Sequence, residues 1–178
     1  APVFISSVPY NTTLSQIKQL PSNTVISISN MVVTAVFPTN DCIYASEADR
    51  STAIRLKMPS SAYSEINISD VLSVTGTISD YKPDGVNSAE RVIVVNRYNK
   101  IGTSEPIEPL AMNNRAIGGG SFSATVKGVK DGFGLHNFGT LAKVTGVVNR
   151  TFSSGNFYID DGSEIPDISG RIGVLITP

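Results

Sequence analysis

The pattern of apolar and polar positions along the chain predicts short β-strands. Apolar and polar residues alternate over residues 25–29 and 71–78, and residues 30–37 are rich in β-branched side chains. Residues 91–98 supply a further strand pattern, and residues 82–85 have the composition of a turn between the last two runs. Short strands in this succession predict an all-β chain.

One segment departs from the strand pattern. Leu14, Ile17 and Leu20 recur at a spacing of three residues, which predicts a single helical turn. Pro21 would end this turn, because proline cannot continue a helix. Helical structure is therefore expected mainly near the start of the chain.

Two parts of the chain resemble each other. A β-branched run, a run with tyrosine at its centre and an apolar run ending at proline follow one another twice. These runs are residues 29–37, 42–47 and 52–59 in the first part, and 144–152, 157–163 and 171–178 in the second. The first part continues through two more strand patterns, whereas the second reaches Pro178 without them. We therefore expect the second part to lack the strands that would close its sheet.

The first part resembles a known fold. Short strands with a glycine at a kink, here Gly76, are typical of a small, partly open Greek-key barrel. Residues 14–99 resemble the oligonucleotide/oligosaccharide-binding (OB) fold of secreted bacterial proteins, with residues 32–35 in the first strand and residues 70–76 in the fourth. The resemblance implies a fold more than a function, because these motifs encode turns and core positions.

The second part resembles the opening of another such module. Residues 109–119 are similar to the joint between two modules in tandem OB proteins, and residues 134–146 and 157–163 are similar to the start of the second module. The fold class implied is all-β, with two OB-like Greek-key barrel modules in tandem, the second incomplete and completed by a strand from another subunit. The expected divisions are an N-terminal arm at 1–13, a first module at 14–104, a linker at 105–132 and an incomplete module at 133–178.

The N-terminal arm offers a candidate for the missing strand. Its apolar side chains are Val3, Phe4, Ile5 and Val8. Leaving a large apolar side chain in water costs about 1.5–3 kcal/mol. The expected acceptor is the edge formed by Val174, Leu175 and Ile176. This complementarity predicts a non-catalytic structural subunit whose partners are copies of itself, joined head to tail into a filament.

The alternative function is ligand binding by the barrel, as an OB module of a larger secreted protein that holds an oligosaccharide or single-stranded nucleic acid. The candidate ligand face consists of Tyr44, Arg55, Lys57, Arg91 and Arg97. Strand alternation places Arg55 and Lys57 on the same side of their strand. A solvated outer face with scattered charges would show the same residues, and acidic Glu47 and Asp49 lie close by in sequence.

Composition favours an exported protein. Hydrophobic residues make up 40% of the 178 residues, enough for a sizeable core, and charged residues only 16%, with serine, threonine and asparagine in their place. A formal net charge of −1 offers no long-range attraction to phosphates, so nucleic acid is disfavoured as a partner. No apolar run approaches the about eighteen residues that span a bilayer. A start at Ala1-Pro2 fits a removed signal peptide, so the expected location is extracellular or the cell surface.

Few residues suggest modification or metal binding. Asn11, Asn67 and Asn149 stand in the N-glycosylation pattern and are candidate sites for covalent glycans. Cys42 is the only cysteine, which excludes an internal disulfide and thiolate metal sites and predicts a buried side chain on a strand. Residues 160–164, with Asp167 nearby, could suggest a calcium loop, but their spacing favours a tight turn.

No catalytic constellation is recognisable. His136 is the only histidine, and no nucleophile-elbow pattern accompanies it. The glycines at 118–120 lack the lysine of a phosphate-binding loop and are interpreted as a hinge between modules. We therefore expect no enzymatic activity, no cofactor and no metal.

Overall fold

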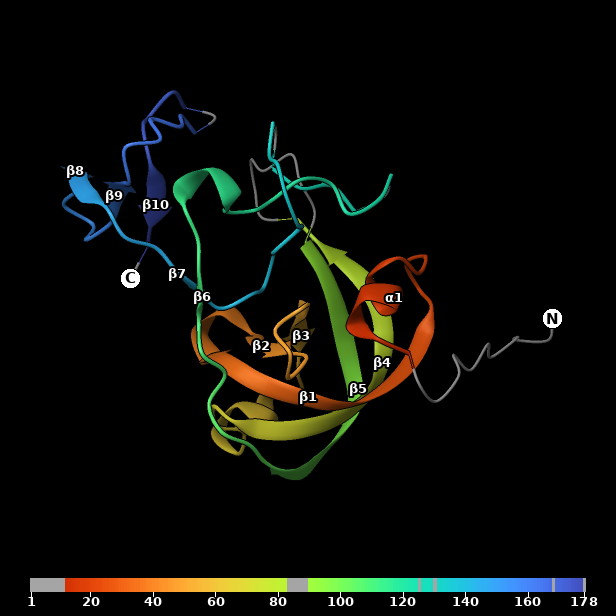
Figure 1. The fold of residues 1–178 in the computed structure, drawn as a ribbon. Coiled ribbons are helices and arrows are strands. Elements are labelled where there is room, and N and C mark those ends of the chain that lie inside the picture. The colour runs from red at the N-terminus through yellow and green to blue at the C-terminus, as the bar shows by residue number, and fades with distance from the viewer. Residues whose placement is uncertain (1–11, 83–89, 125, 130, 168, 178) are drawn as a thin grey trace.

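Strands predominate in the protein (Figure 1). The computed structural model describes residues 12–82, 90–124, 126–129, 131–167 and 169–177. In chain order the elements are α1 (Leu14–Lys18), β1 (Val25–Phe37), η1 (Pro38–Asn40), β2 (Cys42–Ser46), β3 (Ala53–Lys57), η2 (Ser60–Ser64), β4 (Asp70–Tyr81), β5 (Glu90–Thr103), β6 (Leu110–Ala111), η3 (Asn114–Ala116), β7 (Ala142–Lys143), β8 (Val147–Thr151), β9 (Phe157–Asp160) and β10 (Val174–Ile176). Within the described ranges no helix has the length and hydropathy needed to cross a membrane.

Strands β1 to β5 close into a barrel. Their order is β1-β2-β3-β5-β4, and β4 returns to pair with β1. Neighbouring strands are antiparallel except β3 and β5, which run parallel. This is the strand arrangement of an OB-like barrel, which the sequence predicts for this part of the chain. The turn expected at residues 82–85 lies mostly outside the described residues.

Strand β1 pairs with two neighbouring strands. Its first half pairs with β4 and its second half with β2. The pairing with β4 shifts between Ile28 and Met31, where Asn30 has a positive φ of 64°. The sequence suggests separate runs at 25–29 and 30–37, but the structure joins them, because a bulge bends a strand without ending it.

The barrel interior is apolar, and helix α1 packs against it. The fully buried side chains include Ile26, Met31, Val33, Ile43, Ile54, Leu56, Leu72, Ile78 and Ile93. Leu14 and Ile17 of α1 are also fully buried in this core, as their spacing predicts. Thr13 caps the helix, because its hydroxyl accepts a hydrogen bond from the Gln16 amide while the Gln16 side chain accepts one from the Thr13 amide.

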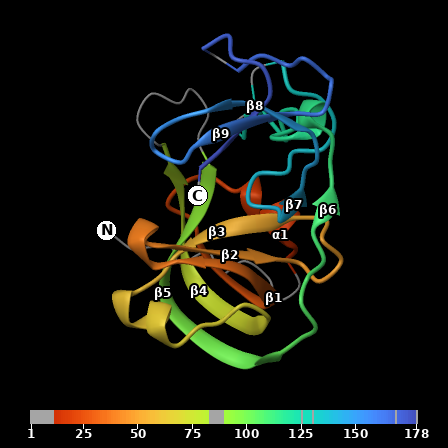
Figure 2. The same cartoon turned by 90° about the vertical axis from the view of Figure 1, so that its left-hand side faces the viewer.

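The rest of the chain forms two smaller sheets. Strands β6 and β7 pair in parallel, and β8, β9 and β10 form an antiparallel sheet in the order β10-β9-β8. Figures 1 and 2 show this C-terminal sheet outside the barrel. The predicted linker contains η3, whose Asn114 side chain donates a hydrogen bond to the Ile159 carbonyl at 2.8 Å. This hydrogen bond ties the linker to the C-terminal sheet.

The predicted glycine hinge has a different role in the structure. Gly119 has a φ of 65°, and a Cβ atom there would lie 1.9 Å from the carbonyl oxygen of Leu135. The Gly120 amide donates a hydrogen bond to the Gly134 carbonyl at 3.1 Å. These glycines therefore allow two backbone segments to cross closely, which is a packing requirement rather than a need for flexibility.

Gly76 should tolerate no side chain. It lies at a register shift between β4 and β5, where a Cβ atom would be 2.4 Å from the Val94 carbonyl oxygen. We expect Gly76→Ala to lower the free energy of unfolding by about 1–3 kcal/mol through overpacking. Gly102→Ala in β5 is the matched control, because no atom lies within 4 Å of its Cβ position. Chemical denaturation of the two variants checks this, and equal stabilities would contradict it.

Candidate functional site

The C-terminal sheet repeats the pairing of the first three barrel strands. In both groups the middle strand pairs with the other two in antiparallel fashion. The β1–β2 register shifts between Val33 and Ala35, and the β8–β9 register shifts in the same way between Val148 and Arg150. The shared register matches Val148 with Val33, Ile159 with Ala45, Phe157 with Ile43, Val174 with Ile54 and Ile176 with Leu56.

The matched residues differ in burial. In the barrel all five belong to the core and are at most 1% exposed. In the C-terminal sheet Val148 is 50% exposed, and its four companions on the same face are only partly buried. The barrel covers this face with β4 beside β1 and β5 beside β3, whereas among the described residues no strand pairs with the outer edge of β8 or β10. The sheet therefore presents an apolar face with two free edges.

Only the middle of the opposite face is shielded by the loop between β9 and β10, because Val147 and Leu175 on that face are exposed. Tyr158, at the centre of β9, is 1% exposed, and its hydroxyl donates a hydrogen bond to Asp167. Burial acts to raise the pKa of Asp167, but hydrogen bonds from Ser169, Tyr158 and Arg171 outweigh it and lower the pKa to about 2. The loop between β9 and β10 therefore buries the middle strand on this face.

The predicted acceptor residues are the whole of β10. Val174 and Ile176 lie on the face that matches the barrel interior, while Leu175 points to the other face and is 43% exposed. The predicted donor residues Val3, Phe4, Ile5 and Val8 lie outside the described residues. The structure shows that residues 174–176 form a strand, and their pairing with the arm stays a prediction.

The barrel face proposed for ligand binding contains an internal polar network. The Tyr44 hydroxyl donates a hydrogen bond to Glu90 at 3.0 Å, and the Arg55 guanidinium lies 3.5 Å from the same carboxylate. Arg55 also donates to the Asn40 carbonyl at 3.1 Å and lies 3.8 Å from the centre of the Tyr81 ring. Sequence reasoning missed Glu90 and Tyr81, because they reach Arg55 only through the β3–β5–β4 pairing.

Tyr44 is not an open stacking platform. Phe37 contacts its ring edge-on at 6.1 Å between centroids. Gly139, from the far half of the chain, lies against the ring, and a Cβ atom there would be 3.2 Å from Tyr44 Cδ1. Burial, followed by the charge and hydrogen bond of Glu90, raises the pKa of Tyr44. Tyr44 therefore has a packing role that leaves little of its ring for a ligand.

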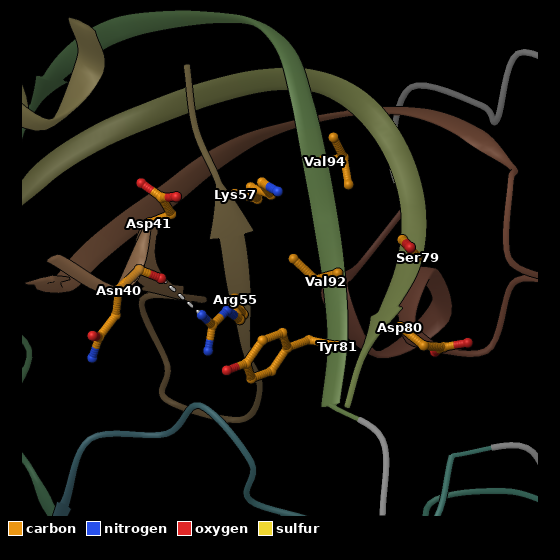
Figure 3. A pocket seen from close by; sticks show the side chains of 9 residues that line it. All are labelled: Asn40, Asp41, Arg55, Lys57, Ser79, Asp80, Tyr81, Val92 and Val94. Atoms are coloured by element: carbon orange, nitrogen blue, oxygen red, sulfur yellow. Dashed lines mark hydrogen bonds between the residues drawn. The ribbon is translucent and has the colours of Figure 1, made fainter. Parts of the chain in front are cut away.

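A pocket of about 290 Å³ remains beside Arg55 (Figure 3). Lys57 lines this pocket with Arg55, together with the carboxylates of Asp41 and Asp80. Figure 3 shows the Asp80 side chain directed away from Arg55, and it pairs with Arg91 at 2.7 Å. Glu90 pairs with Arg55, and Asp41 shares the pocket with Lys57, so the pocket does not favour an anionic backbone.

Two of the predicted ligand residues lie elsewhere. Arg91 is buried, and its Nε donates to the Lys18 carbonyl at 3.0 Å while its other nitrogens bond Ser22, Asp80 and the Leu20 carbonyl. It therefore fastens α1 to the barrel. Arg97 is exposed on β5, opposite Thr75. The structure brings together Tyr44, Arg55 and Lys57 but not these two.

The remaining candidates have structural positions. Cys42 is 2% exposed, and burial raises the pKa of its thiol, which disfavours the reactive thiolate. Asn67 and Asn149 are exposed, and the Asn149 side chain donates to the Ile172 carbonyl at 3.1 Å. Asn11 lies outside the described residues.

The acidic segment at residues 160–164 forms a turn. Asp161 accepts hydrogen bonds from the backbone of Ser163 and of Asn114, and Gly162 and Glu164 have positive φ angles. Within the described part of the chain, no cluster of three or more histidine, cysteine or acidic side chains is placed to hold a metal ion.

A buried cation joins the two halves of the chain. Lys18 is 2% exposed, and its Nζ donates a hydrogen bond to the Phe138 carbonyl at 3.1 Å. Burial lowers the pKa of Lys18 to about 8, against the attraction of Glu90 and Glu47. Sequence reasoning missed this residue, because a lysine on a helical turn is ordinarily exposed.

Comparisons with known proteins give no family. No protein-family model matches the chain, and no curated protein matches it. Among solved structures, the mitochondrial single-stranded DNA-binding protein Rim1 from S. cerevisiae is similar to part of the chain. It is 11% identical with a TM-score of 0.34, over 47% of this chain and 98% of Rim1. A similarity at this level carries no argument, so the OB-like description rests on the strand order of the barrel.

Lys18 should make stability depend on pH. Its pKa is about 8 in the fold against 10.5 for a free lysine, so between these values the unfolded chain binds more protons. The free energy of unfolding should therefore rise as pH increases above 8, and Lys18→Met should lose this rise. Chemical denaturation between pH 7 and 9.5 tests this, with exposed Lys143→Met as control. The same pH dependence in wild type and Lys18→Met would contradict it.

Proposed function

We propose that this chain is a non-catalytic structural subunit whose C-terminal sheet accepts a β-strand from another copy. The observation that carries the proposal is the repeated register: β8, β9 and β10 pair as β1, β2 and β3 do, yet the equivalents of buried core residues stay exposed or half-buried. An edge strand with free backbone groups is a template for another strand. A strand added beside β10 would satisfy the backbone of that edge and cover part of the apolar face.

The free energy available is appreciable. Val148, Val174 and Ile176 lie on the face that matches the barrel core and are incompletely buried. Full burial of such side chains contributes about 1.5–3 kcal/mol each. The backbone of β10 would add hydrogen bonds along the new pair, which matter most where water is excluded.

The barrel supplies a template for the geometry. Strand β5 pairs with β3 in parallel, with Val92, Ile93 and Val94 beside residues 55–57. Residues 174–176 match residues 54–56 of β3, so the incoming strand should run parallel to β10. The apolar residues Val3, Phe4 and Ile5 suit this position, with Val8 further along the arm.

The contact joins two different surfaces of the subunit. An arm at one end of the chain would bind a sheet near the other end, so each copy both donates and accepts. Such a heterologous contact repeats without closing, which generates a filament. The low share of charged residues and the exposed Asn67 and Asn149 support a location outside the cell, with glycans at these sites.

Ligand binding by the barrel has less support. Gly139 and Phe37 lie against Tyr44, Glu90 pairs with Arg55, and Arg91 and Arg97 lie apart from the pocket. Binding of single-stranded nucleic acid draws on open aromatic rings beside unpaired cations. The arrangement at this face offers few of either.

Substituting the apolar face should block assembly and leave the subunit folded. Val148→Lys places a charge on the face that must be covered, whereas Val147→Lys places the same charge on the opposite face of the same strand, where Val147 is already 72% exposed. We expect regular filaments for wild type and Val147→Lys and discrete monomers for Val148→Lys. Electron microscopy and analytical ultracentrifugation read this out, with circular dichroism confirming that each variant is folded.

Removing the donor gives an independent test. A chain lacking residues 1–11 should not form filaments by itself, because it has an acceptor without a strand to insert. A synthetic peptide of residues 1–11 should bind this shortened chain and should not bind its Val148→Lys variant. Undiminished filaments from the shortened chain would rule out the arm as the donor. A wild-type chain that stays monomeric at high concentration would rule out the proposed function.

A further inference from the structure

A small cavity lies where α1 meets the far half of the chain. Its volume is about 270 Å³. Ser15 and Lys18 line it from α1, Thr52 from the turn before β3, and Phe122, Leu135 and His136 from the glycine-rich segment. The cavity is separate from the pocket beside Arg55 and from the C-terminal sheet.

Lys18 brings a buried charge to this cavity, which Glu90 and Glu47 attract without forming a direct ion pair. An ammonium group has three hydrogens to donate, and the described residues give it one acceptor, the Phe138 carbonyl. No carboxylate of the described residues forms an ion pair with it within 4.0 Å. The nearby Glu47 already accepts hydrogen bonds from the Leu14 amide and the Ser51 hydroxyl. A buried cation without a paired anion is costly, so an anion in the cavity would be stabilised.

His136 brings unused polar atoms to the same place. Its ring lies between Phe122 and Phe138, at 6.0 Å and 4.6 Å between centroids. Both ring nitrogens are buried, and no described group meets hydrogen-bonding geometry with either one. Burial and the charge of Lys18 lower the pKa of His136 to about 4, against a weak opposite effect of the Lys127 and His136 backbone. The imidazole is therefore neutral at pH 7 and offers one N–H donor.

The other residues that line the cavity indicate the remaining features of a ligand. Ser15 and Thr52 present hydroxyl groups 2.6 Å apart, joined by a hydrogen bond in which either oxygen can be the donor. Phe122 and Leu135 supply apolar surface on the other side, and Leu135 is 87% exposed at the rim. A single cation suits a single negative charge, whereas a phosphate dianion would be left in excess beside Glu47.

We propose that this cavity binds a small organic monocarboxylate, with its carboxylate at Lys18 and His136 and its apolar body against Phe122 and Leu135. Both donors are buried in the structure, so binding requires a shift of these side chains that lets the ammonium and the imidazole N–H donate to the two carboxylate oxygens. The site contains no residue of the C-terminal sheet, so this proposal is independent of the proposed assembly. Its occupancy would also tie α1 to the far half of the chain.

The single histidine makes binding directly observable. Titrating the full chain with sodium benzoate at pH 7 should shift the imidazole resonances of His136 in a saturable way, followed by NMR. Benzamide, which has the same shape without the charge, should bind at least about tenfold more weakly, a difference of about 1.4 kcal/mol. The exposed variant Lys143→Met should bind benzoate as the wild type does.

Two variants separate the site from general effects. Lys18→Met should abolish the saturable shift, because the cation is lost. Leu135→Asp, at a rim position where the side chain is 87% exposed, should weaken benzoate binding at least about tenfold by repulsion. Absence of a saturable shift in wild type would overturn the proposal. So would equal binding of benzamide, or unchanged benzoate binding in a folded Leu135→Asp variant.

Discussion

A sheet that buries one face must also satisfy the backbone groups along its two outer edges, and the barrel meets that requirement by closing on itself. In the barrel, β4 pairs with β1 and β5 pairs with β3, so every strand has two neighbours. In the C-terminal sheet the same three-strand register recurs, but the described residues leave the outer edges of β8 and β10 free. The proposed assembly follows from treating the second sheet as subject to the same constraint as the first.

Local patterns were enough to predict most of the barrel. Alternation located β4, the strand pattern at residues 91–98 located β5, the three-residue spacing located α1, and Cys42 proved buried on β2 as expected. These features depend on near neighbours along the chain, where side-chain periodicity is informative. The joining of residues 25–29 and 30–37 into one strand was missed, because the bulge at Asn30 leaves no strong pattern.

Long-range contacts account for the rest. Glu90 and Tyr81 reach Arg55 only because β3, β5 and β4 are neighbours, and Gly139 covers Tyr44 from the other half of the chain. The close packing at Gly119 and the burial of Lys18 have the same origin. The pattern of residues along the chain does not indicate which distant segments come into contact. The predicted ligand face was therefore only partly assembled, while residues 174–176, proposed as the acceptor, form the strand β10.

Completion of the C-terminal sheet by another molecule is the central proposal. Hydrogen exchange of the β10 backbone amides, measured across a range of protein concentrations, tests this most directly. If a second copy supplies the strand, amides on the outer edge of β10 should be unprotected at low concentration and become protected as concentration rises, while those of β4 and β5 should not change. Full protection of the β10 edge at the lowest concentration, where the chain is monomeric, would contradict the proposal, as would persistent exposure at the highest.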